Sequence, residues 1–283
     1  MMTPALVAIS HGTSSTAGQA AVRGLVRAVE NAVRIPDSKK RDNPPGSTRR
    51  SIPTVRLGHI DVEQPDVAAT LASLATGEPA VIVPLLLSAG YHVYHDLAAE
   101  RAAAEHPATV TERPPTTAER ATAEPERRIG VGSGTGRRVS VATALGPDER
   151  LATVLAQRLQ QAGATEADTV VLAVAGSSDR RAVADCREMS RMLSNVMGQD
   201  IRLGFLAAAT PLVPEAVRDA HAERPGRRVI VSTYLLAPGY FHDLARSAGA
   251  DVTTEPLLTT DSDPPQELVD IVLERYATAS RRV

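Results

Sequence analysis

Three side chains in the first part of the chain carry groups that could together hold a divalent metal ion. His11 follows the apolar run ALVAIS, Asp61 follows VRLGHI, and His92 follows VIVPLLLSAGY. Imidazole nitrogens and carboxylate oxygens are suitable ligands for metals such as Fe, Co, Ni and Zn. A neutral imidazole also accepts protons near pH 7. These residue types therefore indicate metal binding, proton transfer, or both.

The segments that precede these residues have the pattern of strands in a parallel sheet. Residues 5–10 and 80–87 are short apolar runs, and 55–62 also has strand character. Turn residues follow the first run, and apolar side chains then recur at helical spacing over 20–33. Strands that alternate with helices predict an α/β fold with helices on both faces of the sheet. Such sheets bind ligands beyond the carboxyl ends of their strands, which is where the three candidates fall.

The chain contains this pattern twice. VIVPLLLSAGYHVYHDL at 81–97 returns in shortened form as VIVSTYLLAPGYFHDL at 229–244. We therefore predict two similar, flavodoxin-like halves with parallel sheets, packed around a central cleft. The N-terminal half takes residues 1–106, a Pro-, Thr-, Glu- and Arg-rich flexible linker takes 107–138, and a degenerate C-terminal half takes 139–283.

Reactive residues that occur in one half alone are the better functional candidates. Aligning the strand ends places His11 opposite Ala175 and Asp61 opposite Ala207, and it leaves His92 without a counterpart. The first half is thus expected to carry the active site. Ordinary roles stay open for each residue: His11 could brace the strand–helix turn, and Asp61 and His92 could be solvated surface groups.

Other candidates have simpler explanations in the same alignment. His59 stands opposite Phe205, so packing is the expected role of its side chain. His95 recurs as His242, which favours a role in the shared fold, such as a helix cap. Cys186 is the single cysteine; it allows no internal disulfide and no thiolate cluster, and we expect it to be inert.

Composition excludes several classes of function. The net charge is −2, seven residues are aromatic and none is tryptophan, which argues against nucleic acid as a partner. No apolar run approaches the ~20 residues that a membrane span requires. The first residues, MMTPALVAISHG, lack the sections of a secretory signal. A cytoplasmic protein that does not bind membranes is therefore expected.

Three motifs in the first half resemble those of the sirohydrochlorin chelatase family, the class II chelatases, in its long two-half form. They are HGT at 11–13, GHID followed by proline over 58–65, and GYHVYHD at 90–96. The resemblance covers both halves apart from a polar insert at 36–53 and the linker. It departs from the family pattern at two positions, because Asp61 replaces the usual Glu and His59 replaces an aromatic residue.

The resemblance implies a lyase-class metal chelatase with a chelatase-like fold. Members of the family insert a divalent metal into sirohydrochlorin without ATP, in sirohaem or cobalamin biosynthesis. His11 and His92 would be catalytic and would bind the incoming metal, one of them also taking protons from pyrrole nitrogens, with Asp61 as a further ligand or proton acceptor. Fe²⁺, Co²⁺ or Ni²⁺ would be a substrate, so no permanently bound cofactor is expected. Fe²⁺ is narrowly preferred.

Sirohydrochlorin is an acidic tetrapyrrole with eight carboxylates, so the resemblance also implies an anion-binding surface. Hydroxyls and backbone N–H groups around Thr13, Ser14 and Ser88 are the expected substrate contacts. Arg23 and Arg56 are candidate partners for the carboxylates. A monomer is expected because the two halves are fused.

Two alternatives to the chelatase remain open. One is a non-catalytic carrier of metal or tetrapyrrole that uses the same pocket. The other is a hydrolase that uses the serine-rich turn after His11, although ISHGTSS lacks the G-x-S-x-G pattern.

Overall fold

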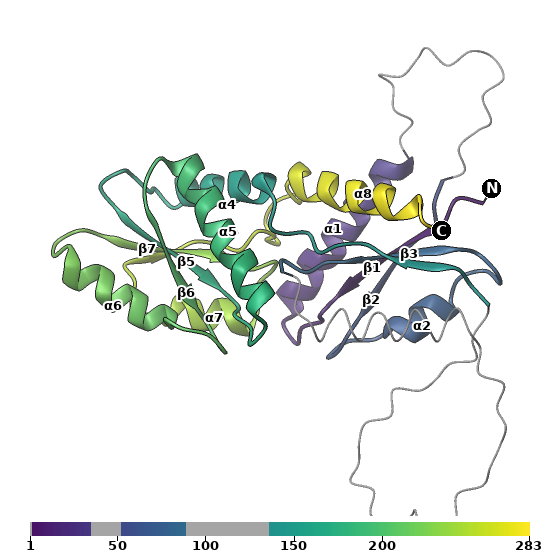
Figure 1. The fold of residues 1–283 in the computed structure, drawn as a ribbon, viewed down its shortest axis with the longest axis horizontal. Helices are drawn as coiled ribbons and strands as arrows, with labels where there is room; N and C mark the ends of the chain where they lie inside the picture. Colours follow the sequence, from purple (N-terminus) through teal and green to yellow (C-terminus); the bar gives the residue numbers. More distant parts are fainter. Residues whose placement is uncertain (1, 35–51, 89–135) are drawn as a thin grey trace, which may run out of the picture.

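The computed structural model describes residues 2–34, 52–88 and 136–283. In this part of the chain, parallel strands alternate with helices, and the strands form two four-stranded sheets (Figure 1). The elements run in chain order as β1 (Ala5–Ser10), α1 (Thr16–Arg34), β2 (Val55–His59), α2 (Val67–Ala72), β3 (Ala80–Pro84), β4 (Val139–Val141), α4 (Glu149–Gln161), β5 (Thr169–Val174), α5 (Arg180–Met197), β6 (Ile201–Phe205), α6 (Val213–Glu223), β7 (Val229–Tyr234), α7 (Tyr240–Arg246), β8 (Val252–Thr253) and α8 (Gln266–Ser280). The predicted α/β fold with two parallel-sheet halves is confirmed.

The two sheets have equivalent strand orders. The first is β2-β1-β3-β4 and the second is β6-β5-β7-β8, with every printed pairing parallel. The register is also equivalent, since the first residue of β1 pairs with the first of β3 (Ala5 with Ala80), and Thr169 of β5 pairs with Val229 of β7. The internal repeat seen in the sequence is therefore a repeat of structure.

Burial explains why the central strands are almost entirely apolar. All six residues of β1, β5 and β7 and all five of β3 are buried. A parallel sheet covered by helices on both faces leaves neither side of its strands in water. The helices are amphipathic by contrast: α1 buries Val22, Leu25 and Val29 and exposes Arg23 and Arg27.

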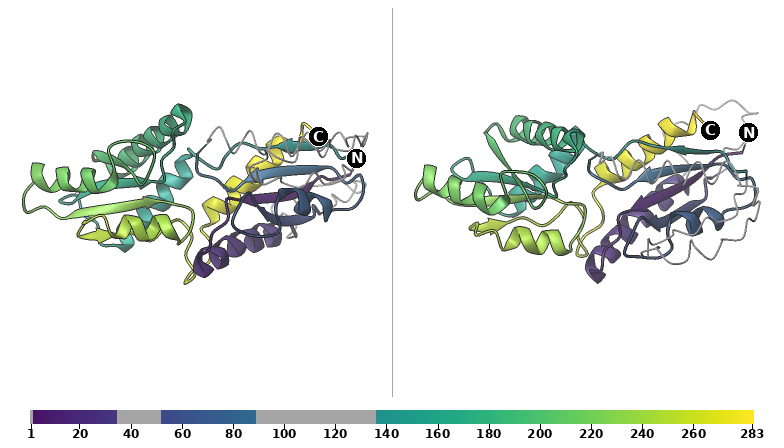
Figure 2. Two further views of the ribbon diagram at one scale, coloured as in Figure 1. Left: turned by 90° about the horizontal axis from the view of Figure 1, so that it is seen from below. Right: turned by 60° about the horizontal axis from the view of Figure 1, so that its bottom comes forward.

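The last helix of each half packs against the other half. α4 follows β4 of the first sheet but contacts α5 and β7, whereas α8 follows β8 of the second sheet but contacts α1, β3 and β4. Figure 1 shows α8, in yellow, lying along the strands of the first half, and Figure 2 shows the two halves end to end from two further directions. The halves therefore exchange helices.

This exchange corrects the predicted boundary at residue 139. β4 opens the range 139–283, yet it extends the first sheet, where Val139 pairs with Ala80 and Val141 with Ile82. The order of strands and helices is the same whichever sheet receives them, so the sequence pattern does not distinguish the two arrangements. The linker predicted at 107–138 lies outside the described residues except at 136–138. There Arg137 is buried, and its guanidinium donates to the carbonyls of Ala75 and Glu78.

The carboxyl ends of the two sheets face each other. Tyr234 ends β7, and its hydroxyl donates to the carbonyl of Leu87, just after β3, over 2.9 Å. The loop after β7 lies against the start of α1, because a Cβ added to Gly18 would meet the Pro238 carbonyl oxygen at 2.3 Å. The loops that follow β1, β3 and β7 thus meet where the halves join.

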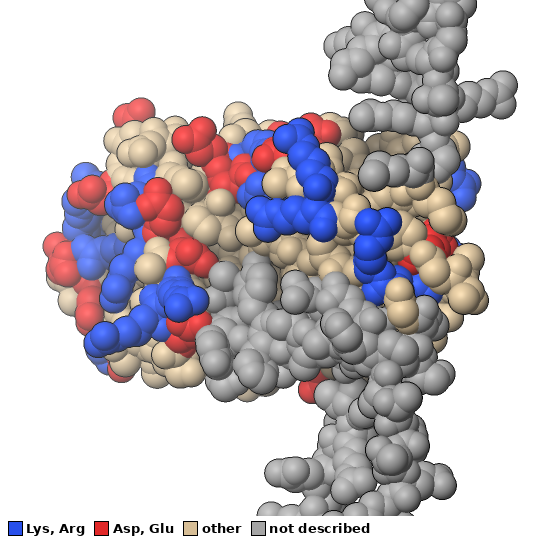
Figure 3. All heavy atoms as spheres, turned by 45° about the vertical axis from the view of Figure 1, so that its right-hand side comes forward, with Lys and Arg blue, Asp and Glu red and all other residues tan. Residues whose placement is uncertain are grey.

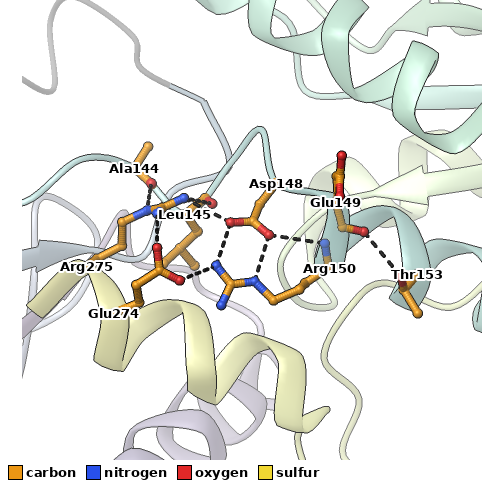
Figure 4. Close-up of polar contacts among 8 residues, drawn as sticks. All are labelled: Ala144, Leu145, Asp148, Glu149, Arg150, Thr153, Glu274 and Arg275. Atoms are coloured by element: carbon orange, nitrogen blue, oxygen red, sulfur yellow. Dashed lines mark hydrogen bonds and ion pairs between the residues drawn. The ribbon is translucent and has the colours of Figure 1, made fainter. Parts of the chain in front are cut away.

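Charged side chains at the base of α4 and on α8 form a second contact between the halves (Figure 4). The Asp148 carboxylate accepts from the guanidinium of Arg150 at 2.8 Å and from that of Arg275 at 3.1 Å. Arg150 also donates to Glu274 at 2.7 Å. Burial by itself would raise the pKa of Asp148, but the hydrogen bonds of Arg150 and the charges of both arginines outweigh burial and lower it. The exchanged helices are therefore joined by ion pairs as well as by apolar packing.

Two further residues of the sequence analysis lie in the second half. His242 is buried in the first turn of α7, and its Nε2 lies 3.2 Å from the Thr254 carbonyl oxygen, so it joins α7 to the chain after β8 and does not cap a helix. Cys186 is buried on α5, and burial raises the pKa of its thiol to about 11, which disfavours the reactive thiolate. Among the described residues, no helix is both long and apolar enough to cross a membrane.

Candidate functional site

His11 and Asp61 lie on neighbouring loops at the carboxyl edge of the first sheet. His11 follows β1 directly and is exposed, and Asp61 comes two residues after β2 and is also exposed. The backbone N–H of Asp61 donates to the His11 carbonyl oxygen at 3.0 Å, just as Ile60 donates to that of Ser10 at 2.9 Å. The structure thus brings these two predicted residues together through their backbones.

The approach of the two loops depends on Gly12. Its φ is +92°, and a Cβ at this position would lie 2.0 Å from the Asp61 carbonyl oxygen. A side chain would both strain this backbone and collide with the neighbouring loop. The Asp61 carboxylate accepts from the N–H of Val62 at 2.8 Å, so the acid also orders its own loop.

A network of polar side chains lies beneath the His11 turn. The Ser10 hydroxyl and Nδ1 of His59 share a hydrogen bond of 2.8 Å. The Glu63 carboxylate lies 3.7 Å from the same Nδ1 and accepts from the backbone N–H of Thr13 at 2.9 Å. The His59 side chain is 6% exposed and that of Glu63 is 12% exposed. The carboxylate of Glu63 therefore links the loop after β2 to the turn after His11.

Burial lowers the pKa of His59, and the charge of Arg23 lowers it further, against the opposing effect of Glu63. A neutral imidazole is therefore favoured at this position near pH 7. Phe205, the counterpart of His59 in the second half, is buried as well. His59 thus combines a packed position with polar partners that Phe205 does not have.

Sequence reasoning missed Glu63 and Ser10. Glu63 stands opposite Ala209 and Ser10 opposite Val174, so the comparison of the halves contained the signal. Serine and glutamate are common residues, so these two differences are a weaker signal than a histidine that occurs in one half alone.

The predicted substrate contacts have different surroundings. The Thr13 hydroxyl oxygen accepts from the Ser15 N–H at 3.1 Å, and Ser15 Oγ accepts from the N–H of Gly18 at 3.2 Å. These two hydroxyls order the first turn of α1. Ser14 is exposed, and Ser88 is half-buried after β3. Among the described side chains, no hydrogen bond joins the His11 ring to a serine hydroxyl, so the arrangement a serine hydrolase requires is not formed there.

The two candidate arginines differ in position. Arg56 is the second residue of β2, three residues before the strand's carboxyl end, and its guanidinium donates to the carbonyl of Val55. Three strand residues span roughly 10 Å, so Arg56 lies about that far from the carboxyl end of β2. This distance argues against the predicted contact with a substrate carboxylate. Arg23 is exposed on α1 and lies close enough to influence His59. Of the two, Arg23 is the one near the site.

His92 and His95 lie outside the described residues. Among the residues that are described, no group of three His, Cys, Asp or Glu side chains could hold a metal ion. His11 and Asp61 alone therefore do not complete the predicted ligand set, and His92 stays a prediction.

The second half adds an aromatic pair close to the Thr13 turn. A Cβ on Gly239 would lie 3.1 Å from the Thr13 hydroxyl oxygen. The two residues that follow it, Tyr240 and Phe241, are 73% and 37% exposed, with ring centroids 5.6 Å apart. The rings are tilted by 57° to each other, so they place exposed apolar area beside the hydroxyl-rich turn without forming one flat surface.

The corresponding edge of the second sheet has the same backbone with different side chains. Gly176 has a φ of +90°, and the N–H of Ala207 donates to the Ala175 carbonyl oxygen at 3.0 Å. Both loops contain a cis proline, Pro65 in one and Pro211 in the other. In place of the imidazole and carboxylate of the first half, alanine stands at 175 and 207.

Two cavities lie away from His11 and Asp61. One of about 1050 Å³ lies between α1 and residues 259–264. The other, of about 550 Å³, lies at the carboxyl edge of the second sheet and is lined by Ser177, Ser178, Arg180 and Arg187, among others. On the face drawn in Figure 3, described basic and acidic side chains are interspersed, so that face carries mixed charge.

The chain was compared with known proteins. No curated protein sequence matches it. Its fold is similar to that of SirB from Bacillus subtilis with Fe³⁺, at 17% identity and a TM-score of 0.67, covering 99% of this chain and 96% of that one. SirB from Bacillus subtilis subspecies spizizenii in complex with cobalt gives 17% identity and a TM-score of 0.66, with 99% and 97% covered. CbiX, the terminal enzyme for biosynthesis of siroheme in denitrifying bacteria, is 14% identical to this chain with a TM-score of 0.52. The match covers 95% of this chain and 98% of that one.

The structural likeness establishes the fold, and the sequence itself establishes the family. The family model described as CbiX matches residues 5–162 and again 169–279, so each of the two matched segments contains one copy of the repeated strand ends. Together the segments cover almost the whole chain, including His11 and Asp61. The chain belongs to the CbiX family.

Proposed function

We propose that this protein is a sirohydrochlorin chelatase, which inserts Fe²⁺ or Co²⁺ into the acidic tetrapyrrole sirohydrochlorin during sirohaem or cobalamin biosynthesis. The observation that carries the proposal is the difference in side chains between the carboxyl edges of the two sheets, which share one backbone path. Each sheet has the same backbone at its carboxyl edge, but only the first has His11 and Asp61 there. Membership of the CbiX family and the likeness to SirB structures with iron and cobalt support the choice of reaction.

The reaction exchanges a metal ion for protons. Two pyrrole N–H groups of the macrocycle lose their protons, the four ring nitrogens bind the divalent metal, and the metal loses its solvent ligands. The exposed imidazole of His11 is suited to accept a proton or to hold the incoming ion. Few protein ligands are an advantage here, because a closed four-ligand site would retain the metal. The metal is a substrate, and no permanently bound cofactor is part of the proposal.

His92 and Asp61 complete the proposed site. The resemblance of GYHVYHD at 90–96 to the family motif supports His92 as the second imidazole. Asp61 is fixed beside His11 by the backbone hydrogen bond between them, which supports a role as ligand or proton acceptor. Its carboxylate also accepts from Val62, so a supporting role suits it better than permanent coordination.

The surroundings suit a flat, acidic ligand. Tyr240 and Phe241 provide an exposed aromatic surface for one face of the macrocycle. Ser14 and Ser88 supply hydroxyls, and Arg23 supplies a cation for the peripheral carboxylates. The Thr13 hydroxyl oxygen accepts from the Ser15 N–H, which fixes the place of the hydroxyl, and its O–H can still donate to a carboxylate.

The test is an anaerobic assay of the purified protein with sirohydrochlorin and Fe²⁺, Co²⁺ or Ni²⁺, followed by the change in absorption. We expect turnover well above the spontaneous rate, and a fall of at least about 100-fold in the His11→Ala variant. His221→Ala, which removes a half-buried histidine of α6 in the second half, is the matched control and keeps full activity.

Two results would contradict the proposal. Stoichiometric binding of metal or tetrapyrrole without turnover would identify a carrier. Full activity in both His11→Ala and His92→Ala would place the chemistry elsewhere.

A further inference from the structure

The carboxylate of Glu63 is the central member of the network under the His11 turn. It accepts from the Thr13 N–H at 2.9 Å and lies 3.7 Å from His59 Nδ1, which shares a 2.8 Å hydrogen bond with Ser10. Thr13 is two residues from His11, and Ser10 directly precedes it. The network therefore contacts the chain on both sides of His11.

The second half shows that the loop backbone forms without this network. The N–H of Phe205 donates to the carbonyl of Pro211 at 2.9 Å, as that of His59 donates to Pro65 at 3.0 Å. Residue 209, in the position of Glu63, is an alanine, and Val174 and Phe205 stand in the positions of Ser10 and His59. The same path is thus built where no carboxylate is present.

Burying polar groups has a cost that the second half avoids. A carboxylate with a 12% exposed side chain has lost most of its water, and a buried imidazole has lost its water as well. Apolar side chains in the same positions satisfy the fold without that cost. The fold does not require this polar network, and burying it costs desolvation free energy. We therefore look for its role at the candidate site.

The hydrogen bond from the Thr13 N–H to the Glu63 carboxylate indicates what that role is. A bond from a backbone N–H to a charged acceptor is shorter and stronger than one between neutral groups. Here it ties Thr13 to the loop that carries Asp61, so the turn between β1 and α1 is held at a point two residues beyond His11. An error of about 1 Å in the position of a reacting group lowers rates strongly.

We infer that Glu63 is a positioning residue, which acts through Thr13 to fix the place of the His11 imidazole. The inference rests on the proposed function for its effect on turnover, but its effect on the turn can be measured without any reaction. Glu63 itself does not need to contact the substrate.

The experiment compares three variants of the full chain. Glu63→Ala removes the acceptor, and Glu63→Gln keeps an oxygen that can accept from Thr13. Glu215→Ala is the matched control, because the Glu215 carboxylate accepts from the backbone N–H of Leu212 at 2.8 Å in the second half. The double variant His59→Phe, Glu63→Ala reproduces side chains that this backbone already accommodates at 205 and 209, and so guards against a failure to fold.

Two readouts are used. NMR follows the Thr13 amide proton and the His11 ring signals, which are assigned with the His11→Ala variant. The chelatase assay gives kcat and KM. In Glu63→Ala and in the double variant we expect faster exchange of the Thr13 amide, a shifted His11 ring signal, and a kcat lowered about tenfold. Glu63→Gln restores kcat to within about threefold of the parent, and Glu215→Ala leaves kcat unchanged.

The outcomes separate the inference from the function it rests on. If the parent protein shows no turnover at all, the proposed function fails, while the NMR signals still report whether Glu63 positions His11. If the Thr13 and His11 signals are unchanged in Glu63→Ala, the inference is wrong. It is also wrong if kcat falls as much in Glu215→Ala as in Glu63→Ala, since a general loss of stability would then account for both.

Discussion

The loop after β2 and the loop after β6 follow the same backbone path and carry different side chains. Both contain a residue other than glycine at positive φ, Val62 in one and Ala208 in the other, and both pair with the turn after the central strand through equivalent hydrogen bonds. In the first half this frame holds His11 and Asp61; in the second it holds alanines. The shape of the loop therefore belongs to the fold, and the two halves differ there in a few side chains.

Substituting the glycines that allow the neighbouring loops to meet, Gly12 and Gly176, is expected to give the largest effect on stability. Gly12→Ala and Gly176→Ala each place a Cβ within 2.0 Å of a carbonyl oxygen, at φ values of +92° and +90°. We expect each to lower the free energy of unfolding by about 3 kcal/mol, because strain and overlap add. Denaturant unfolding measures both.

The same pair should differ in activity. Gly12→Ala displaces His11 and Asp61 and should abolish metal insertion, whereas Gly176→Ala should leave the activity of the folded protein near that of the parent. Equal losses of activity in the two variants would show that the second loop also takes part in the reaction.

The amino ends of the two sheets differ, and pH can expose that difference. In the second half, Asp168 accepts from Arg228 at 2.8 and 3.0 Å, whereas prolines, Pro4 and Pro79, precede the equivalent strands of the first half. The hydrogen bonds from Arg228 lower the pKa of Asp168 from 3.8 to about 2. This depressed pKa contributes stability that is fully present above the unfolded value of 3.8 and is lost as pH falls through about 2.

We therefore expect Asp168→Asn to unfold at lower urea concentration than the parent at pH 7. The gap between the two should narrow as pH is lowered from 4 to 2. A gap that stays constant over this range would mean that the ion pair contributes nothing to stability.

The contact between the facing edges can be weakened at one atom. Tyr234→Phe removes the hydroxyl that donates to the Leu87 carbonyl and leaves that carbonyl without this donor. The expected loss is about 1.5 kcal/mol in the free energy of unfolding. Leu87 follows β3 closely, so hydrogen exchange in the first half should rise together with that in the second. Exchange that rises in the second half alone would show that the contact does not couple them.

The smallest effect is expected for the contribution of the second half to substrate binding. Tyr240→Ala should raise KM for sirohydrochlorin about fivefold and leave kcat almost unchanged, because an exposed ring contributes about 1 kcal/mol of contact. Val196→Ala, which removes an exposed apolar side chain at the far end of α5, is the control. An unchanged KM in Tyr240→Ala would restrict substrate binding to the first half.

Sequence patterns predicted the helices and strands well, because the spacing of apolar residues reflects which side chains each segment buries. The apolar run at 5–10 and the turn after it became β1 and the start of α1, and the strand at 55–62 became β2, ending at His59. The exchange of α4 and α8 was not predictable in this way. Helix periodicity shows which face is buried, and it does not identify the sheet that buries it.

The proximity of two candidate residues was predictable because their positions along neighbouring strands decide it. His11 and Asp61 follow adjacent strands, so their proximity could be inferred from the parallel sheet alone. Arg56 was a poor candidate for the opposite reason, because it lies toward the amino end of β2. Glu63 was missed since its importance depends on a hydrogen bond to Thr13, and sequence spacing gives no sign of that partner.

The exchange of helices has a consequence for how the protein is made. The first sheet is covered by α8, whose side chains Leu268, Ile271 and Val272 are fully buried, and these are among the last residues of the described chain to leave the ribosome. Until they emerge, β3 and β4 lack this cover, and the Ala144 carbonyl after β4 lacks the hydrogen bond from Arg275. The sheet that holds His11 and Asp61 at its edge therefore lacks one of its covering helices until residues 266–280 have been synthesised.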